Sequence, residues 1–198
     1  MSRARRDRFL PAAIAATAAV VAAGTTAQLV DHGLQLESPW LNSSGDGGLF
    51  GGVGDIALVL AALAAAALAM RTRPLPATLA VLPVALVVLA FDKTLRIHDD
   101  IANWRLYYLP LLALTFVALL DVGRRLDSRS LTLMSAGVAL LCLAFGIHAA
   151  GDAVMDRVGV AGDSWGYQVK TVTKHGAEVA GWLLIATGLT HGVRRRRP

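Results

Sequence analysis

Residues 91–105 read FDKTLRIHDDIANWR, and this charged stretch stands between two long apolar runs. The run before it, Leu75–Phe91, and the run after it, Leu106–Val122, are each about long enough to cross the hydrocarbon core of a bilayer. Charge placed against a membrane is costly unless it lies in a loop or is paired. We therefore expect the charged stretch to join two membrane-spanning helices.

The same alternation of apolar runs and polar joints continues in both directions along the chain. The other apolar runs are Phe9–Val30, Gly54–Met70, Leu131–Ala150 and Ala177–Val193. The composition, 55% hydrophobic and 17% charged, is too apolar for an ordinary soluble domain of 198 residues. The sequence predicts an all-α fold, a polytopic transmembrane helical bundle of six spans that forms one domain over residues 1–198.

Basic residues are distributed unevenly between the joints. The N-terminus, the turns at 71–74 and 123–130 and the C-terminus, with the helix ends beside them, carry thirteen arginines against three aspartates, whereas the other joints and their helix ends hold six basic and eleven acidic residues. The positive-inside rule therefore predicts that both termini are cytoplasmic. The abundant alanine, with 16 Arg against 3 Lys, is typical of high-GC bacterial coding. We expect a multi-pass protein of the bacterial inner (plasma) membrane.

The first span has an alternative interpretation. A basic start, an apolar centre and the small residues 24–27 also fit a cleavable signal peptide. The length of the run favours a membrane span. Cleavage after Ala27 would leave five spans with the same orientation of the C-terminus.

Histidines and acids gather at the predicted outer ends of the helices. His148 and Asp152 are spaced i, i+4, and His175 and Glu178 are spaced i, i+3, so each pair shares a helix face. Imidazole and carboxylate are suitable ligands for zinc or iron, and an open position on such a metal would activate a water. The candidate divalent metal site contains His98, His148, Asp152, His175 and Glu178.

The place of His98 in this site depends on the helix before it. If the third helix continues past Phe91, then Phe91, Leu95 and His98 lie on one stripe, which would turn His98 toward the bundle. A haem is not expected, because its histidine ligands would have to lie deeper in the membrane.

The alternative to a metal site is a network in which basic residues neutralise the acids. Its predicted members are Asp55, Asp92, Arg96, Asp99 and Lys174. In this interpretation the polar outer face is structural or faces a partner, which could be another membrane protein or a second copy of the chain. The expected surroundings are the lipid bilayer, and no nucleic acid is expected.

Two catalytic or transport functions compete with the structural one. A metal site would make the chain a membrane-embedded hydrolase acting on a lipid or lipid-linked substrate, by analogy with other polytopic hydrolases. A proton- or ion-coupled carrier would depend on Asp55 and Pro83. The run from Ile56 to Met70 holds almost nothing polar from which to build an ion path, which disfavours the carrier.

Residues 92–99, DKTLRIHD, resemble an "acidic, x, x, Leu, x, x, His, acidic" segment that follows the third span in a group of uncharacterised bacterial six-span membrane proteins. The step Glu178-Val179-Ala180-Gly181 is similar to the entry into their last span, and Ser44–Phe50 resembles the loop before their second. The resemblance implies the six-span architecture. Lys93 stands where a second acid would be expected, which weakens the transfer of a metal site.

Overall fold

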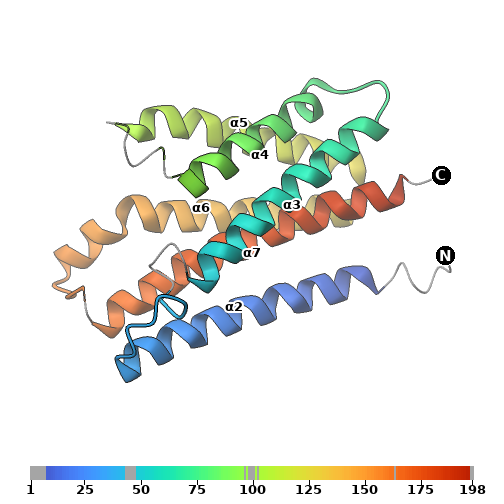
Figure 1. The fold of residues 1–198 in the computed structure, drawn as a ribbon. Helices are drawn as coiled ribbons and strands as arrows, with labels where there is room; N and C mark the ends of the chain where they lie inside the picture. The colour runs from blue at the N-terminus through green and yellow to red at the C-terminus, as the bar shows by residue number, and fades with distance from the viewer. Residues whose placement is uncertain are drawn as a thin grey trace. The chain divides into compact units, whose positions relative to one another are not determined.

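The computed structural model describes residues 8–42, 48–95, 97, 101, 103–162 and 164–196. Within these residues all regular secondary structure is helical, as Figure 1 shows, so the prediction of an all-α fold is confirmed. The helices are α2 (Phe9–Leu34), α3 (Leu49–Arg71), α4 (Ala77–Leu95), α5 (Trp104–Leu126), α6 (Ser128–Arg157) and α7 (Trp165–Arg195).

The helices continue beyond several of the predicted spans. α6 continues to Arg157 and α7 begins at Trp165, so most of the polar joint between the predicted runs Leu131–Ala150 and Ala177–Val193 is helical and not a loop. Hydropathy marks the end of an apolar run, but polar residues also form helix. α4 begins at Ala77, because the carbonyl of Pro76 accepts its first helical hydrogen bonds.

Five helices, α2 to α6, are long and apolar enough to cross a membrane. α7 does not meet this criterion, since Glu178, His191 and several threonines interrupt its apolar residues. Every residue of α7 from Lys174 to Val193 is nevertheless buried or half-buried. A helix covered in this way needs less apolar surface than one that faces lipid.

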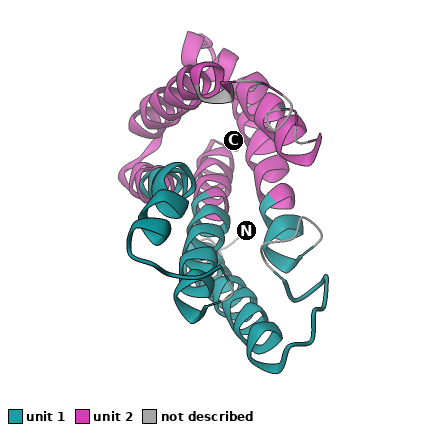
Figure 2. Cartoon of the chain, turned by 90° about the vertical axis from the view of Figure 1, so that its left-hand side faces the viewer, with its two compact units in different colours: residues 1–54, 139–181 teal, residues 55–138, 182–198 magenta. Residues whose placement is uncertain are grey.

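Contacts divide the chain into two compact units, which are coloured separately in Figure 2. Unit 1 comprises residues 1–54 and 139–181, and contains α2, the start of α3, the second part of α6 and the first part of α7. Unit 2 comprises residues 55–138 and 182–198, and contains the rest of α3, α4, α5, the first part of α6 and the second part of α7. The single domain over residues 1–198 stays a prediction.

A phenylalanine is packed against two glycines in unit 1. A Cβ on Gly24 of α2 would lie 2.3 Å from the ring of Phe50, which is fully buried at the start of α3. A Cβ on Gly176 of α7 would lie 3.4 Å from Val21 and 3.9 Å from Phe50. Glycine at position 24 therefore lets the Phe50 ring pack against α2, whereas a Cβ at position 176 would make only ordinary van der Waals contact.

Small residues also mediate the packing of unit 2. On α3, Ala61, Ala62 and Ala65 are buried, where small side chains permit a close approach of neighbouring helices. On α7, a Cβ on Gly188 would lie 2.8 Å from Met134 of α6. Helices α4 and α5 lie side by side within the same unit (Figure 1).

The charged end of α4 is oriented opposite to the prediction. α4 does continue past Phe91, to Leu95. Phe91 and Leu95 are 61% and 62% exposed, however, whereas Asp92 is only 6% exposed. The prediction that the Phe91–Leu95 stripe faces the bundle is therefore wrong, and His98, which would continue that stripe, lies outside the described residues. In a bilayer apolar side chains favour the lipid, and charged ones favour the protein.

Candidate functional site

A lysine ion pair joins α6 to α7 in unit 1. Nζ of Lys170 donates to Oδ1 of Asp152 and lies 3.7 Å from the centroid of the Tyr167 ring. The Lys170 side chain is 10% exposed and that of Asp152 is 70% exposed. Burial alone lowers the pKa of Lys170, but the bonds to Asp152 and Tyr167 outweigh burial and raise it above its usual value. Lys170 is therefore a permanent cation at this site.

Lys170 is not among the site residues that the sequence pattern predicts. No helical spacing relates it to Asp152, because the two residues lie on different helices, α7 and α6, and meet only in the folded chain. The single signal was a basic residue in the segment before the sixth span.

The predicted pair at the start of the sixth span is present. Nδ1 of His175 lies 3.9 Å from Oε2 of Glu178, and both side chains are about one-fifth exposed. His148 and Lys174 both act electrostatically on Asp152, so His148 lies near its predicted neighbour. The predicted ligands of unit 1 thus lie among two lysines, and positive charge opposes the binding of a dication.

The metal site itself stays a prediction. In the described ranges, no group of three or more His, Cys, Asp or Glu side chains could hold a metal ion. His148, Asp152, His175 and Glu178 belong to unit 1. His98, the ligand on which the hypothesis depended most, lies outside the described residues.

The predicted polar network is partly described in unit 2. Oδ1 of Asp55 on α3 lies 3.8 Å from Nζ of Lys93 on α4, and both side chains are partly covered. Asp92 is buried one residue before Lys93. Arg96 and Asp99 lie outside the described residues, and Lys174 belongs to unit 1. The pair of Asp55 and Lys93 therefore carries the described part of the network in unit 2.

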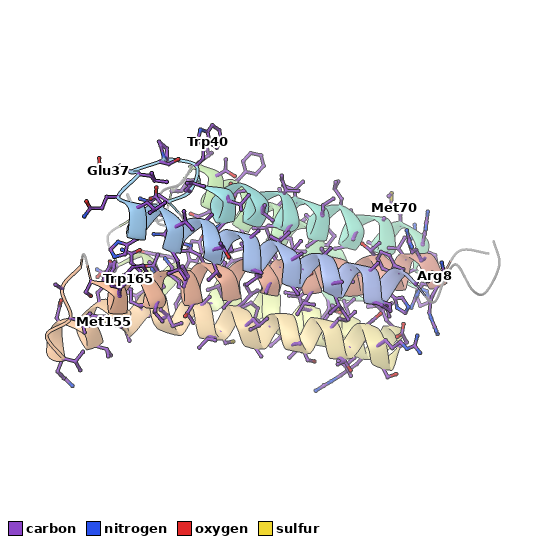
Figure 3. The ribbon with its side chains drawn as sticks, turned by 90° about the horizontal axis from the view of Figure 1, so that it is seen from below. Arg8, Glu37, Trp40, Met70, Met155 and Trp165 are labelled. Carbon is purple, nitrogen blue, oxygen red and sulfur yellow. The ribbon has the colours of Figure 1, made fainter. Side chains whose placement is uncertain are left out.

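Polar and aromatic side chains bind the end of α2 to α7 in unit 1. The amide Nε2 of Gln28 donates to Oε1 of Gln168 at 2.7 Å. The rings of His32 and Trp165 meet edge to face, with their centroids 4.6 Å apart. Figure 3 shows Trp165 beside the end of α2. His32 therefore packs on an aromatic ring.

A buried polar cluster lies where α6 meets the last part of α7 in unit 2. Oδ1 of Asp127 accepts the backbone N–H groups of Arg129 and Ser130 at 2.9 and 3.0 Å, which caps the N-terminus of α6. Nδ1 of His191 lies 3.2 Å from Oγ of Ser130 and 3.4 Å from Oδ2 of Asp127. A hydrolytic triad needs serine and aspartate on opposite ring nitrogens, so this geometry is that of a cap.

Three arginine-bearing segments meet at this end of unit 2. Arg71 donates to the carbonyl of Val193 at 3.3 Å, and Arg196 donates to Oγ1 of Thr72 at 2.9 Å and to the carbonyl of Arg125 at 3.5 Å. The α3–α4 turn, the end of α5 and the end of α7 are thereby connected.

Asp121 forms an ion pair at the same end. Nε of Arg125 donates to Oδ2 of Asp121 at 2.8 Å, one helical turn away, and the hydroxyl of Thr78 on α4 donates to the same oxygen. Asp121 therefore ties α4 to α5.

These features define a class: an all-α protein with five helices suited to a membrane, whose polar groups are paired at the helix ends. The model of a family named domain of unknown function (DUF8692) matches residues 12–191. The chain belongs to this family. No curated protein and no solved structure matches the chain.

Proposed function

We propose that the chain is a multi-pass protein of the bacterial inner membrane, with six spans and both termini in the cytoplasm. Its polar outer helix ends hold the helices together and present a polar face to a membrane partner or a second copy. The observation that carries this proposal is the distribution of polarity among the described residues: many large apolar side chains are exposed, and charged groups between helices are paired.

Helix α3 in unit 2 shows this distribution most clearly. Ile56 and Leu63 are 61% and 62% exposed, while Ala57 and Ala61 are fully buried. A soluble helix buries its large apolar residues and exposes its small or polar ones. Large apolar side chains lose this preference for burial where lipid surrounds the helix. Small residues then face neighbouring helices, because they permit close packing.

α7 supports a sixth span although it is the least apolar helix. The part from Lys174 to Val193 is buried or half-buried throughout, so its polar residues face protein. Thr187 satisfies its hydroxyl on the carbonyl of Leu183 at 2.7 Å, and His191 contacts Ser130. A helix whose polar groups are satisfied in this way can cross a membrane without a fully apolar surface.

The orientation is supported by the basic end of unit 2. Three of the four basic segments in the charge count are bonded to one another through Arg71, Arg125 and Arg196. A single strongly basic end is what the positive-inside rule requires of a cytoplasmic face.

The contact between Gly24 and Phe50 supports a first span that is kept. This contact packs α2 closely on the start of α3 within unit 1. A signal peptide that is removed has no need of a glycine matched to a buried ring.

A substitution at Lys170 tests the structural role of the outer polar groups. Lys170→Met removes the bonds to Asp152 and Tyr167, and we expect it to lower the stability of the detergent-solubilised protein by about 1 kcal/mol. The control is Arg157→Met, which removes an exposed cation near the end of α6 and should change stability little. Thermal unfolding measures both. Equal effects of the two substitutions would show that the Lys170 contacts have no structural role.

Elemental analysis separates this proposal from a metal-dependent hydrolase. We expect the purified protein to carry no stoichiometric zinc or iron. A metal present at one per chain, and lost in His98→Ala, would overturn the structural assignment. The carrier also stays a prediction, and the pairing of Asp55 with Lys93 gives it no specific support.

A further inference from the structure

A pocket of about 540 Å³ opens at the basic end of unit 2. Its walls come from the α3–α4 turn, the start of α4, the end of α5 and the residue that follows α7. This volume lies in the range of sites that bind small molecules. The structural role proposed for the outer polar groups does not use this pocket.

Three guanidinium groups line the pocket, each from a different segment: Arg73, Arg125 and Arg196. Arg73 donates to the carbonyls of Ala69 and Thr72 at 3.3 and 2.9 Å. Each guanidinium carries five N–H donors, and among the described residues its bonds use at most two of them. The three guanidinium groups are therefore held in place, and each keeps N–H donors that are not used within the described part of the protein.

One carboxylate, Asp121, lies beside these arginines and pairs with Arg125. It offsets one of the three positive charges, so the pocket keeps a net positive charge. Convergent guanidinium groups bind phosphate oxygens well, because their planar fork matches phosphate geometry.

Apart from Thr72 and Thr78, the rest of the lining is apolar and includes Leu68, Leu75, Leu79, Val122 and Leu126. A site for a small hydrated anion does not need an apolar wall. An amphiphile with a phosphate at one end and hydrocarbon at the other matches both halves of the lining.

We propose that this pocket binds the phosphate group of an anionic phospholipid of the cytoplasmic leaflet, with the start of an acyl chain along the leucines. The assignment to that leaflet rests on the proposed topology. Basic pockets between membrane helices on the cytoplasmic side are recognised sites for acidic headgroups.

Thermal unfolding in detergent micelles tests this site. Phosphatidylglycerol added to the purified full-length protein should raise the wild-type Tm by about 5 °C at saturation. Phosphatidylcholine should have little effect. The double variant Arg73→Gln/Arg196→Gln should lose most of the rise. A matched double variant, Arg124→Gln/Arg129→Gln, removes the same charge from exposed residues of this end that do not line the pocket, and it should keep the rise.

A second variant allows the pocket to be tested even if the arginine double variant does not fold. Ala77 lines the pocket and is exposed, so Ala77→Phe fills the space while all charges remain. It should also abolish the rise in Tm, with a basal Tm close to wild type.

Three results would overturn the proposal: equal losses in the two arginine double variants, an equal response to phosphatidylcholine, or the full rise with inorganic phosphate alone. The first two would show surface charge or acyl binding, and the third would show a free-anion site. The proposed membrane topology is tested separately by membrane fractionation. It would be contradicted if the chain left the membrane fraction in the absence of detergent.

Discussion

At the scale of single residues, several of the described charges are paired, either between two helices or within one helix. Asp55 with Lys93 in unit 2 and Asp152 with Lys170 in unit 1 each join two helices. Asp121 with Arg125 joins two turns of one helix. Such pairing is how ionisable groups are tolerated beside a membrane.

The cap at Asp127 makes a testable prediction. Asp127→Ala removes the acceptor for two backbone N–H groups of α6 and for Ser130, and we expect a loss of about 1 kcal/mol at neutral pH. Thermal unfolding in detergent measures the loss. Asp156→Ala, an exposed acid near the end of the same helix, is the control and should change little.

The same residue predicts a pH dependence. Burial raises the pKa of Asp127, but bonds from Ser130 and the charge of His191 outweigh it and hold the pKa below the ordinary value of 3.8. A carboxylate with a lowered pKa stabilises the fold above its unfolded pKa, and this contribution is lost as pH falls. The difference between wild type and Asp127→Ala should therefore be full above about pH 4 and shrink below it. A constant difference down to pH 2 would contradict the role of the charge.

Local spacing could predict some of these contacts and not others. Asp121 with Arg125, and His175 with Glu178, follow from i, i+4 and i, i+3 positions on one helix. Asp127 with His191 could not be predicted, since it depends on how α6 packs on α7. His98 remains a prediction.

At the scale of helices, close packing depends on glycine and alanine. Gly24→Ala would place a methyl group against the buried Phe50 ring, and we expect a loss of about 1–3 kcal/mol from overpacking. Gly52→Ala is the matched control, because nothing lies within 4 Å of its Cβ position. Thermal unfolding should show a lower midpoint for the first and an unchanged or higher one for the second.

A compensating change makes this prediction specific. Phe50→Leu combined with Gly24→Ala shortens the side chain that the new methyl group meets, and it should recover part of the loss. If Gly24→Ala and Gly52→Ala behave alike, the close contact of α2 with Phe50 does not exist in solution.

The apolar runs predicted where the helices are, because an apolar run long enough to cross a bilayer usually forms a helix. They did not predict that α6 and α7 continue through polar residues. They also gave the wrong inward face at Phe91 and Leu95, because the rule of apolar residues inside does not hold where lipid surrounds the helix.

At the scale of the whole molecule, the charge asymmetry of the sequence is the basis of the topology. The arginines on the side proposed to be cytoplasmic include Arg71, Arg125 and Arg196, which share one end of unit 2. Membership of a family of unknown function covers residues 12–191 and therefore nearly the whole of the helical chain.

Thiol labelling of intact cells tests the six-span topology most directly. In a Cys142→Ala background, single cysteines replace the exposed residues Glu37 and Gly162, predicted outside, and Ser128 and Arg195, predicted inside. A membrane-impermeant maleimide should label the first two directly, and the other two only after permeabilisation. Labelling at Arg195 in intact cells, with Ser128 protected, would show that α7 does not cross the membrane and would contradict the six-span account.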